Sequence, residues 1–175
     1  PGFDSIAGVF MTSGIRRRRS VRPIDWYLQP LGWPERSEAY LSGAADLFLD
    51  AAGGALNRAG LAAADIDTVV TVSSTGIATP SLEAQVARAI GFRPDIERVP
   101  VFGLGCAGGV SGLSLAARLA QSRPGSNVLL VVVETLNGSR IARSIASTLT
   151  APEPMPSRPD STPAHPIRAK PSGTR

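Results

Sequence analysis

The chain has 175 residues, of which 43% are hydrophobic, and a formal net charge of +4. Its single cysteine excludes an internal disulfide and indicates a reducing compartment, the cytoplasm. No apolar run reaches the roughly 18 residues of a membrane span, and the first residues lack a signal-peptide pattern. Residues 1–136 hold 12 basic and 12 acidic residues, so the positive charge lies in residues 137–175. A neutral body without a basic face argues against a nucleic-acid partner.

The first predicted element after a Pro-broken segment, residues 1–36, is a long helix. Ser37 is a suitable N-cap, and apolar residues recur at helical spacing from 40 to 59. Gly60 is a natural helix stop. The many alanines of this helix predict close packing against a sheet.

A β-branched run over residues 66–74 predicts a strand that is covered on both faces. Thr79, Pro80 and Ser81 then open a second helix, which ends near Gly91. Glu83 complements the dipole of this helix in its first turn.

Residues 99–102 predict a short strand, and residues 110–120 predict a helix that is apolar nearly all round. Such a helix is expected in the middle of a large domain. The run over 128–133 predicts a central, parallel strand. The alternation of helices and strands predicts an α/β layered fold.

The pattern weakens after this strand. Residues 137–150 are ambiguous, with an apolar four-residue spacing that predicts at most one weak helix. From residue 151 onward 7 of 25 residues are proline, which predicts disorder. The sheet would then end at 128–133 with that strand's far edge unpaired, as in a domain cut in half.

Cys106 lies among glycines between the strand at 99–102 and the helix at 110–120. This placement predicts a nucleophile at a strand-to-helix turn. The glycines allow close approach to the sulfur, and the N-terminus of the following helix favours the thiolate. The alternative is a small buried hydrophobe, which is common for a free cysteine.

The runs 69–92, 98–120 and 124–134 together resemble the type III polyketide synthases, the chalcone synthase-like enzymes, with a leaning toward their bacterial alkylresorcinol and alkylpyrone branch. Residues 14–41 are also similar to the bacterial members. The resemblance implies that residues 1–136 form the N-terminal half of a thiolase-like fold, normally packed as a homodimer. Residues 137–175 fall outside it.

The same resemblance implies an acyltransferase whose substrates are acyl-CoA and malonyl-CoA, with no further cofactor or metal. Cys106 would take the starter acyl group as a thioester, which the carbanion from decarboxylated malonyl-CoA then attacks. Ser74 and Thr75 match residues that line the substrate cavity, although both also suit the polar end of a strand. Thr79 matches a loop residue that reaches into the partner's cavity.

Arg16 and Arg19 align with basic residues that hold the CoA phosphates in this family. Arginine suits phosphate, but a run of arginines is also typical of a solvated surface.

The chain departs from the family after residue 134. The histidine and asparagine that work with the family's cysteine are not matched, because His165 lies in the Pro-rich segment and neither Asn127 nor Asn137 fits a family motif. The sequence from residue 135 onward resembles the translation of GC-rich coding DNA in a wrong reading frame. We therefore expect a truncated or frameshifted, inactive synthase.

Three alternatives stay open at this point. The chain could be a non-catalytic partner or pseudoenzyme that uses the family's dimer surface. It could be a fatty-acid condensing enzyme, although these usually carry Ala-Cys-Ser-Gly around the cysteine. An α/β-hydrolase elbow fits only in part, because Leu104 stands where that motif has glycine.

Overall fold

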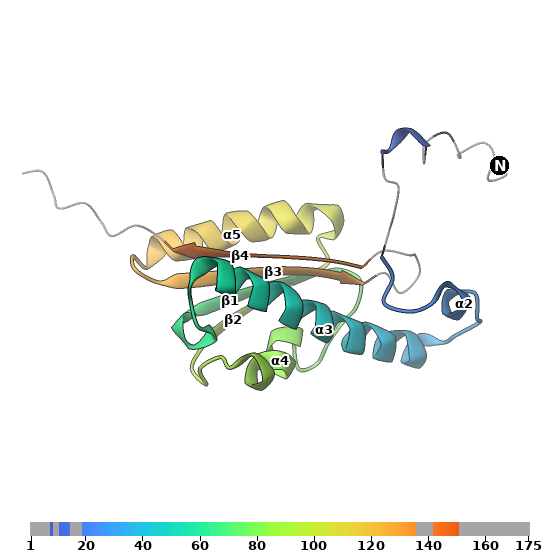
Figure 1. The fold of residues 1–175 in the computed structure, drawn as a ribbon, viewed down its shortest axis with the longest axis horizontal. Coiled ribbons are helices and arrows are strands. Elements are labelled where there is room, and N and C mark those ends of the chain that lie inside the picture. The colour runs from blue at the N-terminus through green and yellow to red at the C-terminus, as the bar shows by residue number, and fades with distance from the viewer. Residues whose placement is uncertain (1–7, 9–10, 15–18, 136–141, 151–175) are drawn as a thin grey trace, which may run out of the picture.

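The computed structural model describes residues 8, 11–14, 19–135 and 142–150. The described chain forms one four-stranded sheet in the order β2-β1-β3-β4, with helices on both faces (Figure 1). The strands are β1 (Thr68–Ser73), β2 (Glu97–Phe102), β3 (Asn127–Thr135) and β4 (Ala142–Thr150). β1 pairs in parallel with both β2 and β3, whereas β4 runs antiparallel to β3.

The helices divide into two layers. α3 (Trp33–Ala59) and α4 (Leu82–Ile90) cover one face of the sheet, and α5 (Gly108–Ser122) covers the other (Figure 1). The short elements are α2 (Ile24–Tyr27) and the 3₁₀ turns η1 (Ala63–Asp65) and η2 (Gly105–Ala107). The predicted α/β layered fold is therefore confirmed. No helix in the described part of the chain is long and apolar enough to cross a membrane.

Each face of the sheet has its own core. Tyr40 and Phe48 of α3 are buried with Val69 of β1 on one face, and Ala116 of α5 is buried with Val72 on the other. All six residues of β1 are buried, as expected for a strand covered on both sides. α3 approaches the sheet closely because small residues such as its fully buried alanines form its inner face, as the sequence predicts.

The predicted start of the long helix at Ser37 is wrong. α3 begins at Trp33, with Gly32 as its N-cap and Pro34 in its first turn. Proline is favoured there because its fixed φ suits a helix and its missing N–H would have no partner. The predicted end is confirmed, since Gly60 caps the helix at a φ of 67°.

The predictions for residues 137–150 are wrong over 142–150, which form a strand rather than a weak helix or an unstructured tail. β4 pairs with β3 from Asn127↔Thr150 to Thr135↔Ala142. The edge of β3 is therefore not left unpaired. Backbone N–H and C=O groups along a buried strand require partners, which outweighs a weak helical spacing. The predictions for 137–141 and 151–175 fall outside the described residues.

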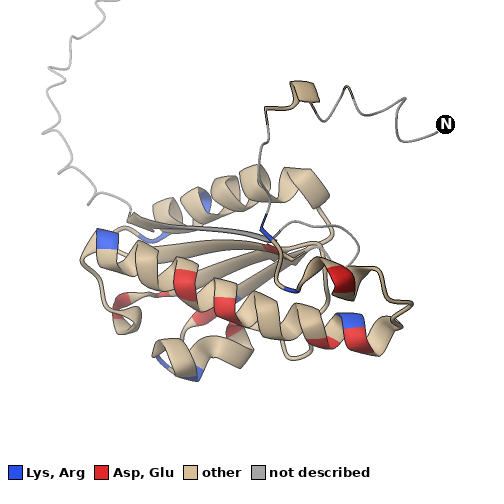
Figure 2. Cartoon of the chain, turned by 45° about the vertical axis from the view of Figure 1, so that its right-hand side comes forward, with Lys and Arg blue, Asp and Glu red and all other residues tan. Residues whose placement is uncertain are grey.

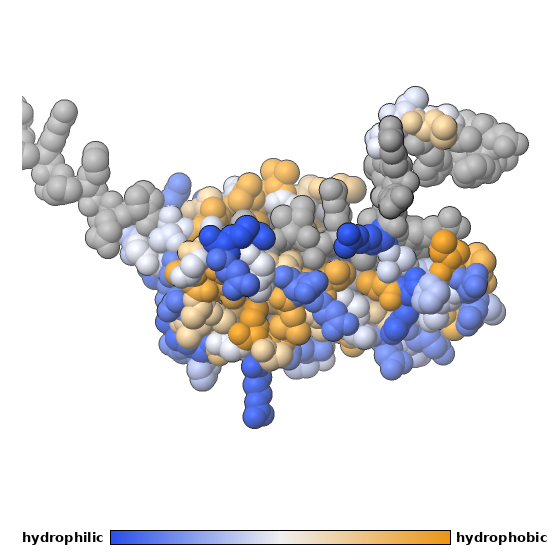
Figure 3. Space-filling view, viewed as in Figure 1, coloured by the Kyte–Doolittle hydropathy of each residue, from blue (hydrophilic) through white to orange (hydrophobic). Residues whose placement is uncertain are grey.

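The expected burial of α5 on nearly all sides is also not observed. Its inner face is buried, but Val110 is 76% and Leu113 is 48% exposed. In the described residues, α5 packs mainly against the sheet, on its inner face. Figure 2 shows little charge on α5 compared with the acidic residues along α3, and Figure 3 shows hydrophobic surface along α5 at the upper edge of the molecule.

Candidate active site

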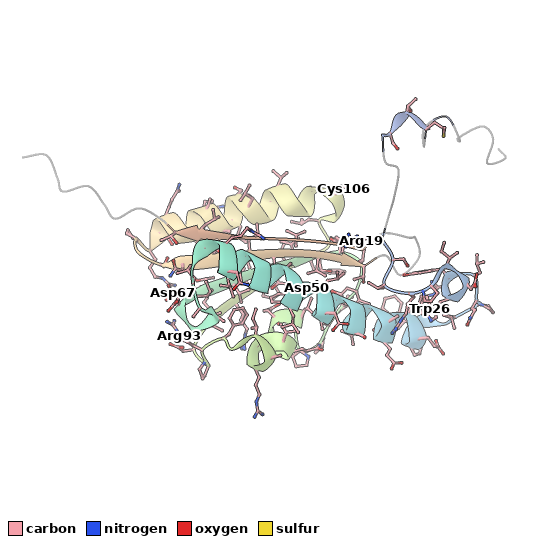
Figure 4. The ribbon with its side chains drawn as sticks, viewed as in Figure 1. Arg19, Trp26, Asp50, Asp67, Arg93 and Cys106 are labelled. Carbon is pink, nitrogen blue, oxygen red and sulfur yellow. The ribbon has the colours of Figure 1, made fainter. Side chains whose placement is uncertain are left out.

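Cys106 lies in the η2 turn, between the end of β2 and the start of α5. Its thiol is exposed (Figure 4). Gly105 directly before it has a φ of 52°, a left-handed conformation that glycine adopts at low cost. The chain can therefore turn sharply from the strand into the helix and present Cys106 at that turn, as the sequence predicts.

Two glycines seat the first turns of α5 directly on β1. A Cβ atom at Gly108 would lie 2.8 Å from Val72 Cγ1, and one at Gly112 would lie 2.6 Å from Val72 Cγ2. Real Cβ atoms do not approach so closely, so any side chain here would push α5 away from the sheet. The glycines thus hold the cysteine turn near the carboxyl end of β1.

A hydrogen-bond network joins the carboxyl ends of three strands beneath this turn. Ser74 Oγ accepts a hydrogen bond from the Gly105 N–H at 2.9 Å, next to Cys106. The Ser74 N–H donates to both carboxylate oxygens of Glu134, at 3.0 and 3.1 Å. Thr75 Oγ1 accepts a hydrogen bond from the Thr135 N–H at 2.9 Å. The backbone beside the thiol is thereby fixed to β1, which is in turn fixed to β3.

The other predicted site residues are not joined to this network. Thr79 is exposed in the loop before α4, next to a cis peptide bond to Pro80. Arg19 is exposed, and Figure 4 places it toward the same end of the sheet as Cys106. Arg16 falls outside the described residues. The substrate and CoA roles of these residues stay predictions.

The structure also shows polar residues that the sequence reading did not single out. Glu134 accepts the Ser74 N–H, as described above. Tyr40 is buried and donates a hydrogen bond to Ser73 Oγ at 2.9 Å. Burial raises the pKa of Tyr40 above its usual value, and the nearby carboxylates of Glu134 and Glu83 raise it further.

Glu83 lies in the first turn of α4, as predicted, but it is fully buried. Its spacing to Val86, another buried residue of α4, was the available signal, because residues three apart share a helix face. For Glu134, the signal was its place at the end of the most apolar strand.

The described residues contain no group of three or more His, Cys, Asp or Glu side chains that could hold a metal ion.

Comparisons with known proteins point to one family. The N-terminal domain of chalcone and stilbene synthases matches residues 32–143. A 1,3,6,8-tetrahydroxynaphthalene synthase of Streptomyces peucetius subsp. caesius is 40% identical over 136 residues, which are 77% of this chain and 36% of that protein. Type III polyketide synthase A of Arabidopsis thaliana is 37% identical over 101 residues, which are 58% of this chain and 26% of that protein.

The fold leads to the same family. The crystal structure of 1,3,6,8-tetrahydroxynaphthalene synthase from Streptomyces coelicolor A3(2), a bacterial type III polyketide synthase, has a TM-score of 0.72 and 31% identity to this chain. The similarity covers 77% of this chain and 38% of that one, so the chain spans little more than a third of the relatives' length. From the family match over residues 32–143 and this shared fold, the chain belongs to the chalcone and stilbene synthases, that is, to the type III polyketide synthases.

Proposed function

We propose that Cys106 is the acyl-accepting nucleophile of a type III polyketide synthase. Its thiolate attacks the thioester carbonyl of an acyl-CoA, the CoA thiolate leaves, and the acyl group stays on the sulfur. Malonyl-CoA then loses CO₂, and its carbanion attacks this new thioester, which frees the cysteine. Splitting one acyl transfer into two steps in this way is the ordinary use of a cysteine nucleophile.

The observation that carries this proposal is the placement of the exposed thiol. Cys106 lies in a turn that leads directly into the 15-residue helix α5, and the backbone N–H next to it is fixed by Ser74 Oγ at 2.9 Å. A helix N-terminus stabilises negative charge, both on a thiolate and on the oxyanion that forms during acyl transfer. Fixing the turn reduces the reorganisation that this stabilisation requires.

The remaining predicted residues take supporting roles in this proposal. Arg19, with Arg16, would bind the CoA phosphates, because guanidinium groups match phosphate geometry. Ser74 and Thr75 would lie along the wall of the acyl site, and Thr79 would contact a second subunit. No cofactor is required, because acyl-CoA and malonyl-CoA are both substrates.

The test is acylation of the full chain by a short acyl-CoA, followed by intact mass spectrometry. The cysteine is the only one in the sequence, so a hydroxylamine-labile adduct identifies a thioester at Cys106. We expect the native chain to be acylated at least about tenfold faster than the urea-unfolded chain, since only the folded turn can stabilise the thiolate and oxyanion.

Variants sharpen this test. Cys106→Ser should give no hydroxylamine-labile adduct, and Ser74→Ala should slow acylation because the Gly105 N–H loses its acceptor. Glu38→Gln, an exposed substitution on α3, is the control and should leave the rate unchanged. Equal rates for native and unfolded chain would contradict the proposal and favour the non-catalytic partner.

We also propose that a second copy of the chain covers an apolar surface formed by Val110 and Leu113 of α5 and by Leu104, which precedes the η2 turn. These side chains are 44%, 76% and 48% exposed and adjoin the cysteine turn. Exposed apolar patches of this kind are typical of subunit contacts. Sedimentation of the chain should show a dimer, and Val110→Asp should shift it to the monomer. A wild-type chain that remains monomeric at high concentration would contradict this contact.

A further inference from the structure

A small cavity lies on the opposite face of the sheet from α5. Its volume is about 90 Å³, and it is lined by residues of α3, α4, β1, β2 and the loop between β1 and α4. Cys106 is not among the lining residues. Successive residues of a strand point to opposite faces, so Ser73 faces this cavity while Ser74 faces the cysteine turn. The cavity is thus separate from the acyl site proposed above.

One of the lining residues, Glu83, has a carboxylate without a partner among the described residues. Glu83 is fully buried, and neither of its carboxylate oxygens has a hydrogen-bond partner among the described residues. Thr71, which is 4% exposed and lines the same cavity, has an equally unpartnered Oγ1. The hydroxyl of Tyr40 is directed to Ser73 instead. Buried polar atoms are nearly always hydrogen-bonded, and a buried carboxylate needs donors or a positive charge.

The residues that line the cavity supply no such charge, because no Lys, Arg or His is among them. The rest of the lining is mixed: Ser73 and Ser81 add hydroxyl groups, whereas Leu82 and Val101 are apolar. Its opening lies beside Ile77 and Phe102, which are each 56% exposed. An occupant must therefore enter past apolar side chains and present hydrogen-bond donors and positive charge to Glu83.

We propose that this cavity binds a primary alkylammonium group, with the ammonium against Glu83 and Thr71 and the alkyl part between Ile77 and Phe102. A hard metal cation fits less well, because it prefers several carboxylate or carbonyl oxygens and Glu83 is the single carboxylate among the lining residues. A cavity of about 90 Å³ is large enough for a short chain of three or four heavy atoms. Both a free alkylamine and a lysine side chain carry this chemistry.

Gly76 keeps the cavity in this shape. Its Cα packs against the ring of Tyr40 so closely that a Cβ atom there would overlap the ring. Tyr40 is itself fully buried and lines the cavity. The Tyr40 side of the cavity is therefore closely packed before any ligand enters, which lowers the ordering cost of binding.

The experiment is a titration of the full 175-residue chain with n-propylammonium, followed by saturation-transfer NMR and by the thermal unfolding midpoint. We expect saturable binding of n-propylammonium and at least about tenfold weaker binding of n-propanol, which has the same alkyl body without the charge. Nα-acetyl-lysine methylamide distinguishes a lysine side chain from a free alkylamine as the natural occupant. It competes with n-propylammonium if the cavity accepts a lysine side chain, and it does not compete if only a free amine fits.

The variants locate the site. Glu83→Gln should weaken n-propylammonium binding by about tenfold or more, and Thr71→Val by a smaller factor, whereas Glu38→Gln and Cys106→Ala should have no effect. The preference for the amine over the alcohol is measured on the wild-type chain and does not depend on any variant folding. Equal binding of amine and alcohol, no saturable binding, or an unchanged affinity in Glu83→Gln would each overturn the proposal.

Discussion

The two ends of the sheet differ in how their polar groups are partnered. At the amino ends of the strands, Asp67 accepts a hydrogen bond from the Asn127 N–H at 2.8 Å and forms an ion pair with Arg93 at 3.2 Å. At the carboxyl ends, Cys106 is exposed and Glu83 has no partner among the described residues. Figure 4 shows Asp67 and Arg93 at one end of the sheet and Cys106 toward the other.

We infer from this difference that the amino ends of the strands contribute to stability, whereas the carboxyl ends are available for binding. Polar groups at the amino ends satisfy one another, so they connect β1, β3 and the loop before β2 without needing a ligand. Groups at the carboxyl ends are held in place by the fold, but the Glu83 carboxylate and Thr135 Oγ1 have no hydrogen-bond partner among the described residues. In parallel α/β sheets, ligands generally bind at this end, where loops rather than strands supply the contacts.

The largest expected effect on stability comes from removing the contacts of Asp67 at the amino ends of the strands. Asp67→Ala removes a charged hydrogen-bond acceptor and an ion pair, so we expect a loss of about 2 kcal/mol in the free energy of unfolding, measured by urea denaturation. Asp50→Ala, an exposed change on α3, is the control and should stay within about 0.5 kcal/mol of the wild type. If both variants lose equally, the amino-end network adds no particular stability.

Tyr40→Phe tests the buried hydroxyl near the carboxyl end. It leaves Ser73 without a donor, and we expect a loss of about 1 kcal/mol at pH 7. Because folding raises the pKa of Tyr40, its stabilising effect is complete below the unfolded pKa of about 10 and is lost as the pH rises toward the folded pKa. The wild type should therefore lose stability above pH 10 more steeply than Tyr40→Phe.

Urea denaturation at a series of pH values measures this difference. Tyr27→Phe, which changes the other tyrosine of the chain, serves as the control and should keep the steep decline. Identical alkaline profiles for Tyr40→Phe and the wild type would show that Tyr40 titrates alike in the folded and unfolded chain.

Thr71→Val is expected to raise the free energy of unfolding, whereas the two preceding substitutions lower it. Its hydroxyl is buried without a partner among the described residues, so replacing it by a methyl group should raise the free energy of unfolding by up to about 1 kcal/mol in the absence of an amine. The measurement is again urea denaturation. A clear loss of stability would mean that this hydroxyl already has a partner in solution.

The smallest effect is expected at the ion pair between Arg123 and Glu97, at 2.7 Å, whose side chains are 62% and 43% exposed. Exposed pairs contribute little because water screens them and ordering the side chains costs entropy. Arg123→Ala should therefore change the free energy of unfolding by less than about 0.5 kcal/mol. A loss of unfolding free energy comparable to that of Asp67→Ala would mean that the stabilising contacts at the amino ends also include Glu97 of β2.

Sequence alone predicted most of the elements, because their signals are local. The β-branched run of β1, the glycine stop at Gly60 and the turn around Cys106 each depend on neighbouring residues. The start of α3 and the strand β4 were missed. The start of α3 was missed because Pro34 suggests a helix breaker, although proline is also favoured in the first turn of a helix. The strand β4 was missed because it depends on pairing with β3.

The candidate site divides in the same way. That a lone cysteine follows a strand and precedes a helix is predictable from the sequence, since the flanking glycines and apolar runs are adjacent to it. Which groups surround that turn, and which have no partner among the described residues, depends on the three-dimensional packing. Ser74 meets Gly105 from 31 positions away, and Glu134 meets Ser74 from 60 positions away. Such contacts arise from strand order and register, which depend on the packing of the whole sheet rather than on any local pattern.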